Sequence, residues 1–133
     1  NNPSIPRPFA TTIINSPKGE LKLIIERVHQ GKNFINHLNK RINRWGEVYK
    51  EYSHIPVRST DDVPSIVVFY CSTKSLAQYI AEKLFLFTLE FPIWLCVEER
   101  VVTAGLERAF YLPKKDGIVP INMEFLKSKR MQK

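Results

Sequence analysis

The residues with the clearest potential for chemistry lie at the end of an apolar run. In LKLIIERV (21–28) the apolar residues deliver Glu26 and Arg27 just before a polar segment. A carboxylate in this position can hold a divalent cation that activates water and neutralises a phosphate. Phosphodiester hydrolysis by this route needs more than one carboxylate, so Glu26 alone is a poor Mg²⁺ site. The plainest alternative is that Glu26 pairs with a surface Lys or Arg.

Basic side chains follow Glu26 at short intervals along the chain. The protein has 20 Lys and Arg against 13 Asp and Glu, which gives a net charge of +7. This balance suits a polyanionic partner such as nucleic acid, and Lys and Arg bind phosphate oxygens without reading the base sequence. We predict that the DNA contacts are made by Arg27, Lys32, Lys40, Arg41 and Arg44. The alternative is a solvated helix face with no nucleic-acid role.

The longest helix is predicted over residues 33–52, after the polar loop that follows the strand bearing Glu26. Its apolar residues recur three or four positions apart, as on the buried face of a helix, and they are Ile35, Leu38, Ile42, Trp45, Tyr49 and Tyr52. The opposite surface carries the basic residues. Gly46 weakens a helix interior by about 1 kcal/mol relative to Ala, so we expect a close packing contact there.

The remaining elements give the order β-β-α-β-α-β. Residues 9–15 and 21–28 form a predicted hairpin around the Pro and Gly of 16–20. Later elements with clear patterns are a buried strand at 65–71, a helix at 72–87 with hydroxyl residues at its start, and a strand at 91–97. The two last strands and the helix between them form a βαβ unit, whose strands should be parallel.

The fold class that follows is α/β, a small mixed sheet flanked by helices. Residues 98–109 are expected to form a short helical turn and loop, and 110–113 an edge strand. We expect residues 1–133 to be one domain and a piece of a longer protein, with residues 114–133 as a basic, partly flexible tail.

Several kinds of chemistry lack any supporting motif. There is no Gly-rich nucleotide-binding motif, no C-x-x-C pair and no G-x-S-x-G nucleophile motif. We therefore predict no metal, no cofactor and no small-molecule substrate. Cys71 and Cys96 lie in apolar runs, which indicates buried thiols in a reducing compartment and a cytoplasmic location. No apolar stretch approaches the roughly 20 residues that span a bilayer.

Four phrases occur in the order seen in one known family. They are RPFATTII (7–14), LIIERVHQG (23–31), INHLNKRINRWGEVY (35–49) and PSIVVFYCSTKSLAQYIAEKL (64–84). Their order and spacing resemble the C-terminal domain of the plasmid replication-relaxation family. The resemblance implies a restriction-endonuclease-like domain of PD-(D/E)xK topology, joined to a winged-helix domain that binds DNA.

The departures from that family pattern concern the nuclease residues. Phe9 stands where the first acid would be, Glu26 can fill the second acid position, and Val28 stands where Lys would be. Arg27 and Lys32 are basic but out of register, because successive residues of a strand point to opposite faces. The resemblance therefore implies a domain that does not cut DNA.

Three functions remain open at this point. The first is a non-catalytic domain of a plasmid or mobile-element protein in replication, transfer or their regulation, which contacts DNA phosphates or dimerises a separate DNA-reading domain. The second is an interaction or oligomerisation module without DNA binding, with residues 85–87 or 91–97 as the seam of a homodimer. The third is a metal-dependent nuclease that uses Glu26.

Overall fold

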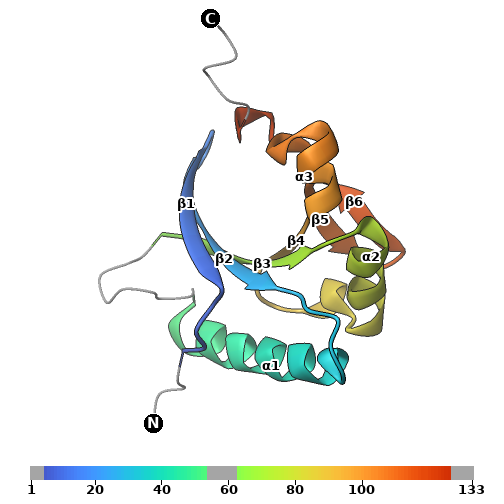
Figure 1. Cartoon of the computed structure of the whole chain (residues 1–133). Helices are drawn as coiled ribbons and strands as arrows, with labels where there is room; N and C mark the ends of the chain where they lie inside the picture. The colour runs from blue at the N-terminus through green and yellow to red at the C-terminus, as the bar shows by residue number, and fades with distance from the viewer. Residues whose placement is uncertain (1–4, 54–62, 127–133) are drawn as a thin grey trace, which may run out of the picture.

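A computed structural model of the protein describes residues 5–53 and 63–126. Six strands form one mixed sheet in which the spatial order follows the chain order (Figure 1). The strands are β1 (Ala10–Ser16), β2 (Gly19–Arg27), β3 (Ser65–Cys71), β4 (Ile93–Val97), β5 (Phe110–Lys114) and β6 (Gly117–Pro120). The predicted α/β class with a small mixed sheet is thus confirmed.

The first two strands form the expected hairpin. β1 and β2 pair antiparallel, from Ala10 opposite Ile25 to Ser16 opposite Gly19. The Ser16 hydroxyl donates a hydrogen bond of 2.6 Å to the Gly19 carbonyl, and Gly19 has φ +122°, a conformation that favours glycine. This closed turn fixes the register that brings Glu26 and Arg27 to the far end of β2.

The centre of the sheet is parallel. β3 lies between β2 and β4 and pairs with both in parallel register, with Phe69 opposite Glu26 on one side and Leu95 on the other. Nearly all of β3 is buried, as its unbroken apolar run predicts. The parallel pairing expected of the βαβ unit is confirmed.

Two helices cover one face of the sheet. α1 (Phe34–Tyr52) and α2 (Lys74–Lys83) share a core with side chains of β2, β3 and β4 (Figure 1). The Thr73 hydroxyl accepts a hydrogen bond of 3.1 Å from the Leu76 amide and caps α2. Gly46 of α1 lies against Phe91, with 3.7 Å from an added Cβ to the Phe91 ring, which is ordinary van der Waals contact.

The second predicted helix is shorter than its apolar pattern suggests. α2 ends at Lys83, and Phe85 adopts a left-handed conformation with φ 51° before the turn η1 (Leu86–Thr88). This reversal buries Leu86 completely and leaves Phe85 and Phe87 exposed. The expectation of a helix through residue 87 is therefore wrong, because a local turn places Leu86 in the core.

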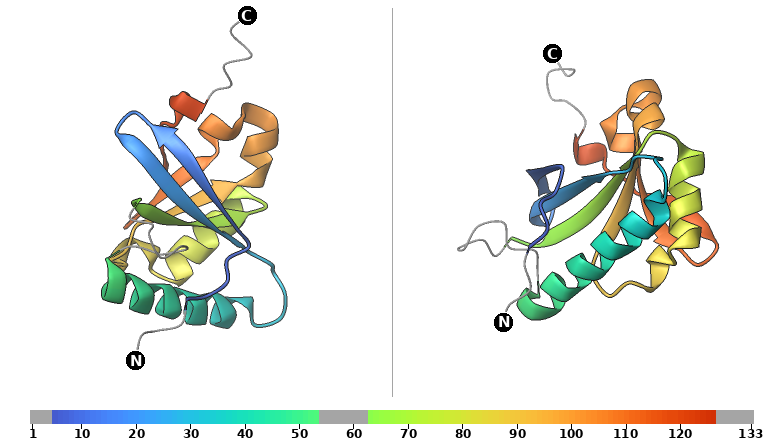
Figure 2. Two further views of the ribbon diagram at one scale, coloured as in Figure 1. Left: turned by 90° about the vertical axis from the view of Figure 1, so that its left-hand side faces the viewer. Right: turned by 60° about the horizontal axis from the view of Figure 1, so that its bottom comes forward.

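The opposite face of the sheet has its own smaller core. Its cover consists of α3 (Glu98–Ala104) and two short turns, η2 (Leu106–Arg108) and η3 (Glu124–Leu126). Figure 1 and Figure 2 show the hairpin of β1 and β2 standing apart from α3. The two cores thus lie on opposite faces of one curved sheet.

The expected tail from residue 114 is wrong for residues 114–126. β6 pairs antiparallel with β5, with Lys114 opposite Gly117, and η3 follows. The charged residues 114–116 form a hairpin turn that Gly117, with φ +141°, allows to close. Residues 127–133 lie outside the described part of the chain.

Cys71 and Cys96 are free and buried, as expected. Within residues 5–53 and 63–126, no helix is long and apolar enough to cross a membrane.

Candidate nucleic-acid interface

Glu26 is a buried carboxylate held by two side chains of α1. Arg41 donates from Nε to Glu26 Oε1 at 2.8 Å and from a terminal nitrogen to Oε2. The indole Nε1 of Trp45 also donates to Oε2, at 2.6 Å. The Glu26 residue is only 5% exposed. The sequence suggested that Glu26 pairs with a Lys or Arg at the surface. The partner is Arg41, but the Glu26 carboxylate is buried.

Local periodicity accounts for this arrangement. Alternation along β2 turns Ile24 and Glu26 toward α1, while Arg27 faces the other side of the sheet. Arg41 and Trp45 are four residues apart, so they lie on the same face of α1. A buried charge is tolerated when it is paired and hydrogen-bonded, and here a two-point arginine contact and an indole N–H meet that need.

Arg41 also connects the N-terminal segment to the helix. Its terminal nitrogen donates a hydrogen bond of 2.7 Å to the backbone carbonyl of Arg7. The Arg41 side chain remains 35% exposed, so it can still meet a phosphate at its outer edge. Its first role is nevertheless to neutralise Glu26. This role of Arg41, like the contacts of Arg7 and Trp45, was not predicted from the sequence.

Arg27 lies on the opposite face of β2 and packs on an aromatic ring. Its guanidinium carbon is 5.6 Å from the centre of the Phe9 ring, a cation–π contact. Phe9 precedes β1 and is 62% exposed, whereas Val28 is buried against α1. At the position that the family pattern would give to an acid, Phe9 packs against Arg27. At the position that the pattern would give to a lysine, Val28 is a core side chain.

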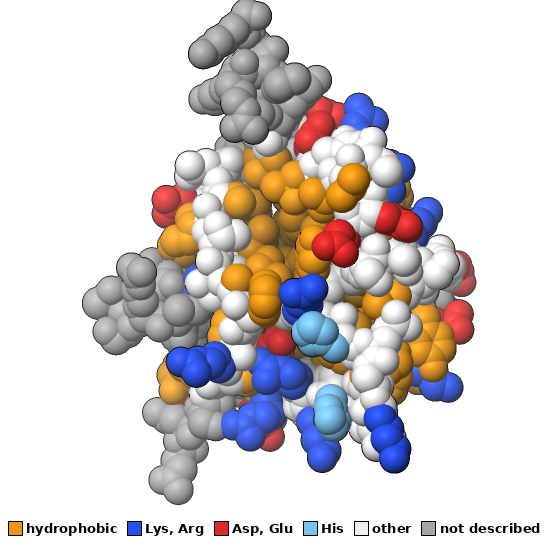
Figure 3. Space-filling model, viewed as in Figure 1, with side chains coloured by type: hydrophobic (Ala, Val, Ile, Leu, Met, Phe, Trp, Pro, Cys, Tyr) orange, Lys and Arg blue, Asp and Glu red, His pale blue; other side chains and the backbone are white. Residues whose placement is uncertain are grey.

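The other predicted contacts lie on the surface around Glu26. Lys32 is exposed in the connection between β2 and α1, and Lys40 and Arg44 are exposed one turn apart on α1. We call Arg7, Lys32, Lys40, Arg41 and Arg44 the basic surface, whereas Arg27 lies on the other face of the sheet. Figure 3 shows Lys, Arg and His side chains gathered over α1 and the adjoining strand ends. Glu26 is nearly enclosed within this surface.

The electrostatics of this region favour anions. Among the residues that the structure describes, no group of three or more His, Cys, Asp and Glu side chains is placed to hold a metal ion. Both Glu26 oxygens accept hydrogen bonds from Arg41 or Trp45, and the guanidinium charge repels a second cation at the same carboxylate. The exposed Lys and Arg side chains attract phosphate oxygens instead.

The fold and the site define an α/β domain in which the basic surface surrounds a buried carboxylate, Glu26, that is paired with Arg41. Comparisons of the chain with protein-family models, curated proteins and solved structures gave no match.

Proposed function

We propose that this domain binds DNA through its backbone phosphates and does not cleave it. The supporting observation is the state of Glu26, whose two carboxylate oxygens are engaged by Arg41 and Trp45 in a buried site. A nuclease centre would leave such a carboxylate open to a metal ion and water. The exposed basic residues around it provide contacts that depend on charge and not on base sequence.

The order of the four sequence segments also supports a proposal about the kind of protein to which this domain belongs. The domain is a restriction-endonuclease-like module that has lost its catalytic residues, in a cytoplasmic plasmid or mobile-element protein of the replication-relaxation type. Phe9 and Val28 at the positions for an acid and a lysine support the loss of catalysis. Arg27, Lys32, Lys40, Arg41 and Arg44 act as phosphate contacts.

A titration of labelled duplex DNA followed by fluorescence anisotropy tests this function. The affinity should fall steeply as salt rises, since each neutralised phosphate releases counterions, with a slope in log–log form of about −0.9 per phosphate contact. Incubation of supercoiled plasmid with Mg²⁺ or Mn²⁺ should leave it intact. Nicking that disappears in Glu26→Ala would instead establish the nuclease alternative.

An interaction module is the second candidate, and one observation favours it. Phe85 and Phe87 are 61% and 41% exposed on either side of the buried Leu86, and exposed aromatic side chains are enriched at protein interfaces. Light scattering of the wild type and of Phe85→Ser tests it. A homodimer that the substitution dissociates, together with no affinity for DNA at low salt, would favour this candidate over DNA binding.

A further inference from the structure

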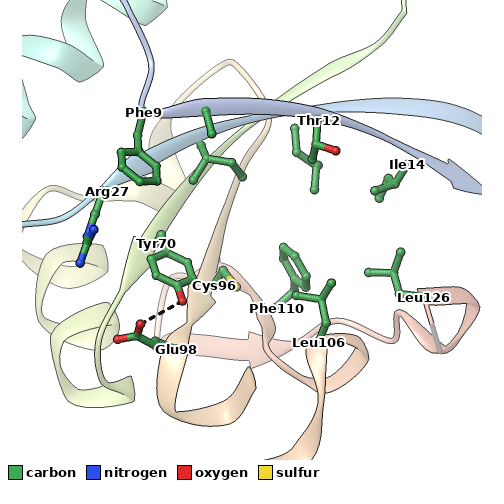
Figure 4. Close-up of a pocket in the computed structure, with 13 residues that line it drawn as sticks. Phe9, Thr12, Ile14, Arg27, Tyr70, Cys96, Glu98, Leu106, Phe110 and Leu126 are labelled. Carbon is green, nitrogen blue, oxygen red and sulfur yellow. Dashed lines mark hydrogen bonds between the residues drawn. The ribbon is translucent and has the colours of Figure 1, made fainter. Parts of the chain in front are cut away.

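The sheet face opposite α1 holds an open groove, and of the five proposed phosphate contacts Arg27 alone lines it. Its volume is about 510 Å³, within the roughly 300–1,000 Å³ of small-molecule sites. β1 and β2 form one wall, and Tyr70, Phe110 and Leu106 form the other (Figure 4). In Figure 3 the groove is visible as a hollow lined by hydrophobic side chains.

The groove changes in character along its length. Arg27 and Phe9 lie at one end, and Ile14 and Leu126 lie at the other, with Thr12 pointing in between them (Figure 4). The charged groups therefore gather at one end and the far end is apolar. A ligand that matches this gradient is elongated, with a polar head and an apolar tail.

The charge at the polar end selects the head group. The Arg27 guanidinium is held on the Phe9 ring. Glu98 lies at the same end, but its carboxylate accepts a hydrogen bond of 3.2 Å from the Tyr70 hydroxyl. Burial, first, and then the Glu98 charge raise the pKa of Tyr70, so this hydroxyl keeps its proton near neutral pH. The hydrogen bond leaves the negative charge of Glu98 in place, so an anionic head is favoured where it contacts Arg27 directly and lies away from Glu98.

The shape and hydrogen bonding of the groove argue against a peptide. β1 is an edge strand of the sheet, so a peptide added as a further strand would pair beside β1 and would not fill the groove on the sheet face. A flexible hydrocarbon chain has no backbone groups to satisfy and can follow the curved wall.

We propose that this groove binds a single-chain amphiphile with an anionic head group, the head beside Arg27 and the tail directed toward Leu126. The apolar lining supplies affinity in proportion to the buried chain, and Arg27 supplies the choice of head group.

Calorimetric titration of the purified chain with dodecanoate, below its micelle concentration, tests the proposal. We expect saturable binding of one molecule per chain, at least about tenfold tighter than that of the neutral glycerol ester or of dodecyltrimethylammonium. Hexanoate should bind at least about a hundredfold more weakly, because it buries six fewer methylene groups. Equal affinity for all three head groups would contradict the role of Arg27, and no saturable binding of dodecanoate would overturn the proposal.

Two pairs of variants locate the site. Thr12→Trp fills the groove from β1 and should abolish binding. Thr11→Trp should retain it, because Thr11, the preceding residue of the same strand, is exposed and does not line the groove. Arg27→Glu should weaken dodecanoate binding at least about tenfold and strengthen that of the cationic amphiphile, while Lys114→Glu at the distant β5–β6 turn changes neither.

Other occupants of the groove would give different results. If light scattering shows a dimer that Thr12→Trp converts to a monomer, the groove is an interface between two copies, and the proposal is wrong. Unchanged dodecanoate affinity in Thr12→Trp, with circular dichroism showing that the variant is folded, would place the amphiphile elsewhere and would also overturn it.

Discussion

The Glu26 carboxylate and the Arg41 guanidinium face each other across the interface between β2 and α1 and form a two-point ion pair. Glu26 has a side chain only 6% exposed, whereas that of Arg41 is 35% exposed. The two partners are therefore not equivalent, because the loss of Arg41 leaves a buried negative charge that, among the residues the structure describes, keeps the Trp45 indole as its hydrogen-bond donor.

Arg41→Ala should be strongly destabilising for this reason. Removal of one partner of a buried ion pair costs about 3–5 kcal/mol of the free energy of unfolding, and chemical denaturation measures it. Lys40→Ala is the matched control, because Lys40 is the residue before Arg41 in the same helix and its side chain is exposed. We expect its effect to stay within about 0.5 kcal/mol. Equal effects of the two substitutions would show that the ion pair does not stabilise the fold.

Gly46→Ala should stabilise the protein. An added Cβ lies 3.7 Å from the Phe91 ring, so it fits without a clash, and alanine is better than glycine in a helix interior by about 1 kcal/mol. Thermal and denaturant unfolding measure the gain.

Gly117→Ala provides the opposite case in the same protein. No atom lies within 4 Å of the added Cβ, but φ is +141°, where residues with a side chain are strained. We expect a loss of stability from the backbone alone.

If Gly46→Ala instead destabilised the protein, the added Cβ would lie closer to the Phe91 ring than 3.7 Å.

The two buried thiols should make the stability of the fold depend on pH in the alkaline range. Burial raises the pKa of Cys71 and of Cys96 from 9.0 to about 12. Below pH 9 both states keep these protons, and between pH 9 and 12 the unfolded chain releases them first. Stability should therefore fall as pH rises through this window, by up to about 1.4 kcal/mol per pH unit for each thiol.

A double variant, Cys71→Ala with Cys96→Ala, isolates the contribution of the thiols from other groups that titrate in this range. It should lose less stability than the wild type between pH 9 and 11, as measured by denaturant unfolding. An identical loss in the two proteins would show that the thiols ionise alike in the folded and unfolded states.

Patterns that repeat within one element predicted much of the fold. The β3 run was predicted at residues 65–71 and forms there, because burial on both faces requires an unbroken apolar segment. The end of α2 was not predicted, since the left-handed turn at Phe85 depends on where Leu86 meets the core. β6 was also missed, although Asp116 and Gly117 form a recognisable turn signal.

The candidate site was only partly accessible from the sequence. Glu26, Arg27 and the basic residues of α1 could be selected by type and position. Their partners could not, because Arg41 and Trp45 reach Glu26 from another element, and only their four-residue spacing hints at a shared face. The groove depends on the curvature of the first hairpin and on the short turns opposite it, which leave no periodic signal.

The salt dependence of DNA binding tests the proposed function most directly. Anisotropy titrations of one labelled duplex, at a series of salt concentrations, would compare the wild type with the double variant Lys40→Ala and Arg44→Ala. Lys83→Ala, exposed at the end of α2, serves as the control. We predict that the double variant binds any duplex sequence more weakly than the wild type does. The magnitude of its log–log salt slope should decrease by about 2, because two phosphate contacts are lost. An affinity that is independent of salt, or equal slopes in all three proteins, would contradict phosphate binding by this surface.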